Sequence, residues 1–169
     1  YVDLSAVAKG FAVDKVALIL DDFGISSYLV EIGGELRLHG HNGEGKTWRI
    51  GVENPQVGGK IRPIGVSEVG VATSGDYRNY FEKDGVRYSH TIDPFTGRPI
   101  THNLASITVV AESAAKADAL ATAFSVLGGD KAMTLAKKHG IAVYMIERKG
   151  EGFVSRYSPS FEAYLEAGK

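Results

Sequence analysis

The chain of 169 residues carries 19 basic and 20 acidic residues, and 44% of its residues are hydrophobic. This length and composition predict a single domain over residues 1–169 with its own core. The chain lacks the excess of basic residues that would indicate a nucleic-acid partner. No run of its sequence approaches the roughly 18 apolar residues that span a membrane. The absence of cysteine excludes disulfides, a thiolate metal site and a cysteine nucleophile.

In the first half of the chain, apolar residues at helical spacing predict a helix over Leu4–Phe23 that ends before Gly24. A strand is expected over Ser27–His39, interrupted by Gly33-Gly34, because paired glycines inside a strand suggest a bulge or a close backbone approach. The pattern predicts further strands at Trp48–Val52, Ile61–Val66 and Gly70–Thr73.

In the second half, Asp84-Gly85 predicts a hairpin turn between strands Tyr80–Glu82 and Val86–His90. The remaining expected elements are a strand at Ala105–Val110, helices at Ser113–Leu127 and Asp130–His139, and strands at Ile141–Glu147 and Gly152–Arg156. Runs of strands with grouped helices indicate an α+β fold, in which mixed, mostly antiparallel sheets carry helices packed on them.

Asp118 and Thr122 are one turn apart in the expected helix Ser113–Leu127, so they share a face. A carboxylate and a hydroxyl in this arrangement offer two oxygen ligands to a hard cation such as Mg²⁺. The alternative is that Asp118 faces solvent and Thr122 bonds its own backbone. The spacing alone does not separate the two.

The segment SHTIDPFTGRP at Ser89–Pro99 holds His90, which can act as a general acid or base near neutral pH. Asp93-Pro94 and Thr96-Gly97 predict a turn that fixes His90 at the end of a strand. The alternative is an ordinary transition from a hairpin to a loop, with a surface histidine.

The segment DLSAVAKGFAVD at Asp3–Asp14 offers Asp3, Lys9 and the backbone around Ala6. A lysine is a point charge suited to phosphate, and the backbone at a helix start can also meet an anion. The alternative is a capping Asp3 and a Lys9 that extends to solvent.

Together with ADALATAF at Ala117–Phe124, these motifs occur in an order that resembles the ApbE family of FAD:protein FMN transferases over nearly the whole chain. The segment TSGDYRNYF at Thr73–Phe81 is also similar to that family. The resemblance implies an ApbE-like, T-fold-related α+β domain and a transferase activity.

The resemblance also implies roles for individual positions. The main-chain carbonyl of Ala6 and the side chains of Asp118 and Thr122 would bind the metal. Three further positions would contact FAD, namely Asp3, Lys9 and Ile92. The resemblance also ties His90 to activity, and this residue is our candidate for the base.

The implied reaction is the metal-dependent transfer of FMN from FAD, the substrate, to a threonine or serine hydroxyl of an acceptor flavoprotein, with release of AMP. The cofactor would be Mg²⁺ or Mn²⁺, and its role would be to bridge the pyrophosphate and neutralise charge. Two alternatives stay open: a metal-dependent FAD pyrophosphatase that yields FMN and AMP, and a non-catalytic flavin-binding domain.

The family's acceptors include subunits of membrane redox complexes, so the resemblance implies a location in the periplasm or at the outer face of the inner membrane, often as a lipoprotein anchored through an upstream cysteine. The chain begins at Tyr1, directly before a dense motif. We therefore expect it to be the C-terminal part of a longer flavin transferase whose own N-terminal half is a further partner.

Overall fold

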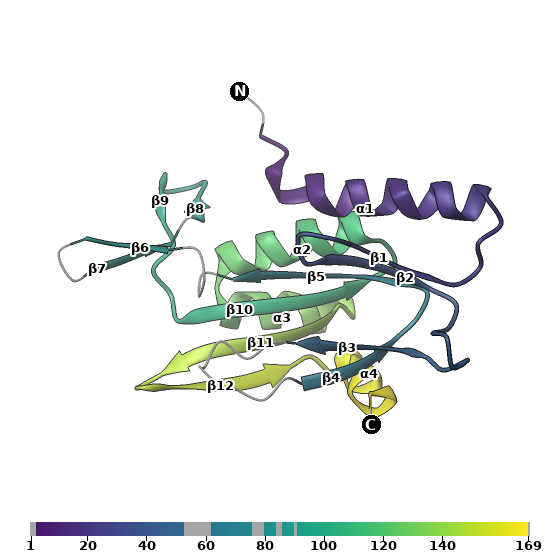
Figure 1. The fold of residues 1–169 in the computed structure, drawn as a ribbon. Coiled ribbons are helices and arrows are strands. Elements are labelled where there is room, and N and C mark those ends of the chain that lie inside the picture. Colours follow the sequence, from purple (N-terminus) through teal and green to yellow (C-terminus); the bar gives the residue numbers. More distant parts are fainter. Residues whose placement is uncertain (1–2, 53–61, 76–79, 84–85, 90, 169) are drawn as a thin grey trace.

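The computed structural model describes residues 3–52, 62–75, 80–83, 86–89 and 91–168, and its centre is a six-stranded sheet in the order β1-β2-β5-β10-β11-β12 (Figure 1). Every neighbouring pair in this sheet is antiparallel. The strands are β1 (Tyr28–Ile32), β2 (Glu35–His39), β5 (Val69–Gly75), β10 (Leu104–Ala111), β11 (Ala142–Lys149) and β12 (Gly152–Tyr157). The central strand β10 is buried along nearly its whole length, as expected for a strand covered on both faces.

One face of the sheet is covered by α2 (Ala114–Leu127) and α3 (Gly129–His139). Small residues of α2 such as Ala117 and Ala121 pack with Ile107 and Val109 of β10, so the helix lies close to the sheet. The first helix, α1 (Ser5–Asp22), crosses α2 and forms a separate cluster with it and β1 around Val13 (Figure 1). Two helices therefore meet directly above the sheet.

The opposite face is covered by the hairpin of β3 (Trp48–Val52) and β4 (Arg62–Val66), by the short helix η1 (Pro159–Phe161) and by α4 (Glu162–Ala167). Phe161 is fully buried there, and Leu165 lies beside it in the same cluster. This last helix was not expected from the sequence. Its six residues are too few to show a helical period, and it is stabilised by contacts with β4 and η1.

The mixed, antiparallel α+β fold predicted from the sequence is confirmed, and α1, α2 and α3 lie within one residue of their expected bounds. One prediction was wrong: Ser27–His39 is two strands rather than one interrupted strand. Gly33 and Gly34 have φ of 62° and 99°, and they form the two-residue turn of the hairpin β1–β2. Positive φ at both central residues is the requirement of a type I′ hairpin turn, which glycine meets without strain.

Two small hairpins project beside the sheet: β6 (Tyr80–Lys83) with β7 (Val86–Ser89), and β8 (Ile92–Asp93) with β9 (Arg98–Pro99) (Figure 1). The first was predicted as a pair of strands, and the predicted Asp84-Gly85 turn between them lies outside the described residues. The second lies within Ser89–Pro99, where the sequence predicted a turn but not the two short strands.

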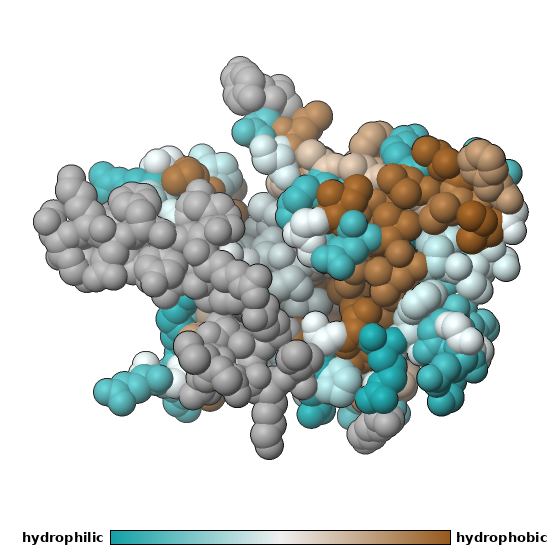
Figure 2. Space-filling model, in the orientation of Figure 1, coloured by the Kyte–Doolittle hydropathy of each residue, from teal (hydrophilic) through white to brown (hydrophobic). Residues whose placement is uncertain are grey.

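The outer surface of α1 is unusually apolar. Figure 2 shows apolar side chains gathered over this helix and the neighbouring chain, and the exposed large hydrophobic residues of this region are Leu4, Phe11, Val16, Leu18, Ile19, Phe23, Ile25, Leu29 and Ile32. A contiguous patch of this kind marks an interaction surface more often than a free one. Among the described helices, none is long and apolar enough to span a membrane.

Candidate active site

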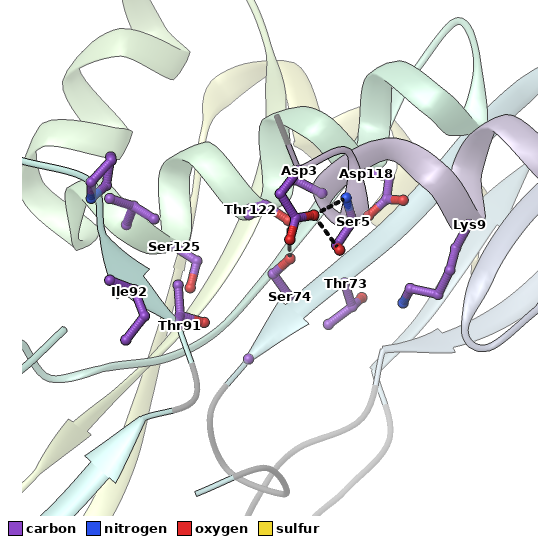
Figure 3. A pocket seen from close by; sticks show the side chains of 14 residues that line it. Asp3, Ser5, Lys9, Thr73, Ser74, Thr91, Ile92, Asp118, Thr122 and Ser125 are labelled. Atoms are coloured by element: carbon purple, nitrogen blue, oxygen red, sulfur yellow. Dashed lines mark hydrogen bonds between the residues drawn. The ribbon is translucent and has the colours of Figure 1, made fainter. Parts of the chain in front are cut away.

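A cavity of about 730 Å³ lies between the start of α1, the middle of α2, the end of β5 and the β8 hairpin (Figure 3). It is lined by Asp3, Ser5, Ala6, Lys9, Thr73, Ser74, Gly75, Thr91, Ile92, Pro94, Asp118, Thr122, Ser125 and Val126. Six of the seven site residues predicted from the sequence therefore line one cavity. The seventh, His90, lies outside the described residues.

Asp118 is a buried carboxylate, with only 3% of its surface exposed. Its Oδ2 accepts a hydrogen bond of 2.9 Å from the N–H of Gly10 in α1. In a regular helix the same N–H points at the carbonyl four residues earlier, which is that of Ala6. The carboxylate of Asp118 and the carbonyl of Ala6 are therefore neighbours, and both line the cavity. The solvent-facing alternative for Asp118 is excluded.

The close approach of α1 and α2 depends on Gly10. A Cβ at this position would lie 2.3 Å from the carbonyl oxygen of Ala114, which is a backbone atom and cannot rotate away. Only glycine lets the two helix backbones come this near. The contact sets the distance between the start of α1 and the cavity-lining face of α2.

The axial position of α2 is fixed by Asp14, the last residue of the first motif. Its two carboxylate oxygens accept hydrogen bonds of 2.9 and 2.8 Å from the N–H groups of Ala114 and Ala115. The hydroxyl of Ser113 accepts a third, 3.2 Å long, from Lys116 N–H. Three of the unpaired N–H groups at the helix start are thereby satisfied, two of them from α1.

Thr122 lies one turn beyond Asp118, and its hydroxyl is 3.3 Å from that of Ser74 on β5. Figure 3 shows the pair between α2 and the strand, facing the same space as Asp118. Either oxygen can be the donor, so the pair leaves lone pairs available toward the cavity. The sequence offered no basis for assigning Ser74 a role, because it is 48 residues from its partner.

Asp3 lies at the mouth of the cavity just ahead of α1. Its Oδ1 accepts hydrogen bonds from the Ser5 hydroxyl and, at 2.7 Å, from the Ser5 N–H. The hydroxyl bond and then the backbone bond hold the pKa of Asp3 below its ordinary value, since both favour the ionised form. Asp3 is therefore an anion through the neutral range, placed at the start of the helix.

Lys9 extends from α1 into the cavity and ends 2.7 Å from Oε1 of Glu35, the first residue of β2. Glu35 is only 2% exposed, and its burial raises the pKa of this carboxyl even though Lys9 acts in the opposite direction. Sequence reasoning missed Glu35 because 26 residues separate it from Lys9. The paired glycines Gly33-Gly34 just before it were the only local feature of the sequence that could have drawn attention to Glu35.

Ile92 and Thr91 form the wall of the cavity opposite Lys9 (Figure 3). The loop beyond them is ordered by Asp93, whose Oδ1 accepts a 2.9 Å hydrogen bond from Phe95 N–H and whose carbonyl accepts one of 2.8 Å from Gly97 N–H. The turn predicted from Asp93, Pro94 and Gly97 is thus present, with Gly97 at a φ of 66°. Ile92 is about half exposed, so its side chain is available to an apolar ligand.

The fold and the cavity define an α+β protein with an oxygen-rich pocket that combines a buried carboxylate, hydroxyls and one lysine. This combination suits a divalent cation together with a phosphate-containing ligand.

Comparison with known proteins agrees with this class. The ApbE family matches residues 1–145, and the chain belongs to that family. It is 50% identical to the FAD:protein FMN transferase of Haemophilus influenzae over 169 residues, covering 98% of this chain and 49% of that protein. It is 46% identical to the enzyme of the same name from Escherichia coli K12, again covering 49% of it.

Among solved structures, the apo flavinyl transferase ApbE of Pseudomonas stutzeri superimposes with a TM-score of 0.89 and 46% identity, over 99% of this chain and 52% of that one. The ApbE protein of Thermotoga maritima gives 0.86 at 36% identity over 97% of this chain and 53% of that one. The resemblance predicted from the motifs is confirmed. The chain spans about half the length of the relatives it matches.

Proposed function

We propose that this chain carries the transfer site of a metal-dependent FAD:protein FMN transferase, which moves FMN from FAD to a threonine or serine hydroxyl of an acceptor protein and releases AMP. The observation that carries the proposal is that one cavity holds three candidate cation ligands, Ala6, Asp118 and Thr122, together with candidate FAD contacts at Asp3, Lys9 and Ile92.

The donor set fits Mg²⁺ or Mn²⁺. Asp118, Thr122 and the Ala6 carbonyl offer one carboxylate, one hydroxyl and one carbonyl oxygen, all hard ligands. Among the described residues, no group of three or more histidines, cysteines or acidic residues forms an all-protein cage. Mg²⁺ commonly uses one or two carboxylates and completes its shell with substrate phosphates and water. When bound, the cation would neutralise charge on the pyrophosphate oxygens.

In the proposed reaction, the acceptor hydroxyl oxygen forms a bond to the phosphorus of FMN, and the bond from that phosphorus to the bridging oxygen breaks so that AMP leaves. The hydroxyl proton passes to a base, for which His90 is our candidate from the family resemblance. Lys9 would donate hydrogen bonds to phosphate oxygens, and Ile92 and Thr91 would orient the ligand from the opposite wall.

The remaining proposals concern context. The relatives have about as much chain again beyond the matched region, and the apolar outer surface of α1 is suited to packing against further protein. We propose that a further half of the protein covers this surface. A periplasmic location and an acceptor that is a subunit of a redox complex are likewise proposals, which stand on the family resemblance.

The test is to incubate the protein with FAD, Mg²⁺ and a candidate acceptor and to weigh the acceptor. A mass gain of one FMN on the acceptor is expected. Free FMN and AMP without that gain would indicate a pyrophosphatase instead, and unchanged FAD would contradict catalysis. Asp118→Asn, which keeps an acceptor for Gly10 N–H, should remove metal-dependent turnover. Asp22→Asn, an exposed position at the end of α1, is the control.

A further inference from the structure

Behind the cavity, the buried carboxylate of Glu35 forms an ion pair with the half-exposed Lys9. The carboxylate is 2% exposed while the lysine side chain is 50% exposed, so the pair extends from the protein interior to the cavity surface. Oε1 is 2.7 Å from the ammonium. Among the described residues, Oε2 is buried without a hydrogen-bond partner.

This arrangement is unfavourable for the fold by itself. A buried carboxylate loses its hydration, and one oxygen without a donor leaves that loss only partly compensated. The effect shows in the pKa of Glu35, which burial raises and the Lys9 contact lowers. An apolar residue would fill the same place at less cost to stability. The charge is therefore better explained by what it does to Lys9.

The turn before Glu35 restrains the other end of the lysine. A Cβ at Gly33 would lie 3.3 Å from Cδ of Lys9, so the aliphatic stem rests directly on the glycine turn. Glu35 follows two residues later, at the first position of β2. The hairpin β1–β2 thus contacts Lys9 at two points. Its glycine turn packs against the aliphatic stem, and the carboxylate of Glu35 binds the ammonium.

We propose that Glu35 is a positioning residue that fixes the ammonium of Lys9 at the cavity wall before a pyrophosphate ligand arrives. This inference rests on the proposed function for the identity of the ligand. A lysine has three N–H donors, and Glu35 engages one of them, which leaves donors for phosphate oxygens. A long lysine side chain loses much rotational freedom when it is ordered, and binding is stronger when that loss precedes the ligand.

The first experiment measures binding to Glu35→Gln, which keeps the shape and the acceptor at Oε1 but removes the charge. FAD affinity is read from flavin fluorescence with Mg²⁺ present, and inorganic pyrophosphate is titrated as a competitor. Both ligands should bind about tenfold more weakly, which corresponds to about 1.4 kcal/mol. Glu112→Gln, which breaks the exposed pair between Glu112 and Lys116 at 2.6 Å, should change neither affinity.

Coupling to Lys9 separates a positioning role from a general structural one. In a Lys9→Met background, Glu35→Gln should have no further effect on pyrophosphate affinity, because the group it positions is gone. Equal losses in both backgrounds would overturn the proposal, as would weaker FAD binding with unchanged pyrophosphate binding. Glu35→Asp keeps the charge but withdraws it by one methylene, and it should fall between the wild type and Glu35→Gln.

A readout without ligand keeps the two proposals separable. Lys9 is held in an ion pair, so an amine-reactive acetylating reagent should modify it slowly, and peptide mapping should show faster modification in Glu35→Gln but not in Glu112→Gln. An unchanged rate at Lys9 would overturn the positioning role. If the wild type fails to bind FAD while this rate still rises, the proposed function fails and the restraint on Lys9 stands.

Discussion

Replacement of Gly10 by alanine tests whether the close crossing of α1 and α2 sets the geometry of the cavity. The added Cβ would lie 2.3 Å from Ala114 O and 2.8 Å from Ala115 Cα, whereas ordinary van der Waals contact begins near 3.4 Å. Both are backbone atoms, so α1 must shift by about 1 Å relative to α2. Mg²⁺ holds its oxygen ligands at about 2.1 Å in near-octahedral geometry. A helix shift of about 1 Å would therefore prevent the Ala6 carbonyl and the Asp118 carboxylate from binding the same ion.

The expected loss of stability is the difference between two effects. Overpacking typically costs about 1–3 kcal/mol, whereas alanine in a helix interior gains about 1 kcal/mol over glycine. The net destabilisation should be about 0–2 kcal/mol, or a drop in Tm of up to about 8 °C at this chain length. Calorimetry with and without Mn²⁺ measures both stability and metal binding.

Gly43→Ala is the matched control for this experiment, because Gly43 has open space around it and no positive φ. It should leave Tm and metal affinity unchanged. The key expectation for Gly10→Ala is a metal affinity at least tenfold weaker, even if the Tm falls by only a few degrees. A Gly10→Ala protein with wild-type metal affinity would refute the assignment of Ala6 and Asp118 to one site.

Three further predictions follow from single contacts. Asp14→Ala removes two of the three side-chain hydrogen bonds to the start of α2 and should cost about 1–2 kcal/mol in urea unfolding, whereas Asp22→Ala, which is exposed, should cost almost nothing. Ser158→Ala should cost about 1–3 kcal/mol by the same measurement, because the fully buried hydroxyl donates to Ile141 O and accepts from Val143 N–H. Burial raises the pKa of Glu35 above 4.5, so the ionised form is disfavoured in the folded state. The free energy of unfolding of the wild type relative to Glu35→Gln should therefore fall as the pH rises above about 4.5, and a pH-independent difference would contradict this.

Local patterns predicted the parts of this fold that local physics decides. The apolar spacing of α1 and the span of α2 up to the Gly128-Gly129 stop are properties of contiguous sequence, and both helices appear where expected. The α1 prediction held although the helix leaves many large apolar side chains exposed, because the spacing alone defined it. Local sequence signals do not indicate which face of a helix another element covers.

The misses depend on contacts between distant parts of the chain. Glu35 resembles any glutamate at a hairpin until β2 brings it under Lys9. Ser74 becomes a site residue only because β5 pairs with β10 and thereby lies below Thr122 on α2. The paired glycines were predicted to mark a bulge or a close backbone approach inside one strand, whereas their positive φ places them in a turn between two strands.

The first motif gains a physical meaning from these contacts. Ala6, Gly10 and Asp14 recur every four residues, so they form one stripe along α1. Gly10 bonds Asp118, and Asp14 caps the start of α2. The stripe therefore fixes both the separation and the register of α2, and it sets Asp118 beside Ala6 without any contribution from a ligand. Lys9 lies next to this stripe and reaches the hairpin instead, so one helix brings the proposed cation ligand Ala6 and the proposed phosphate contact Lys9 to a single cavity.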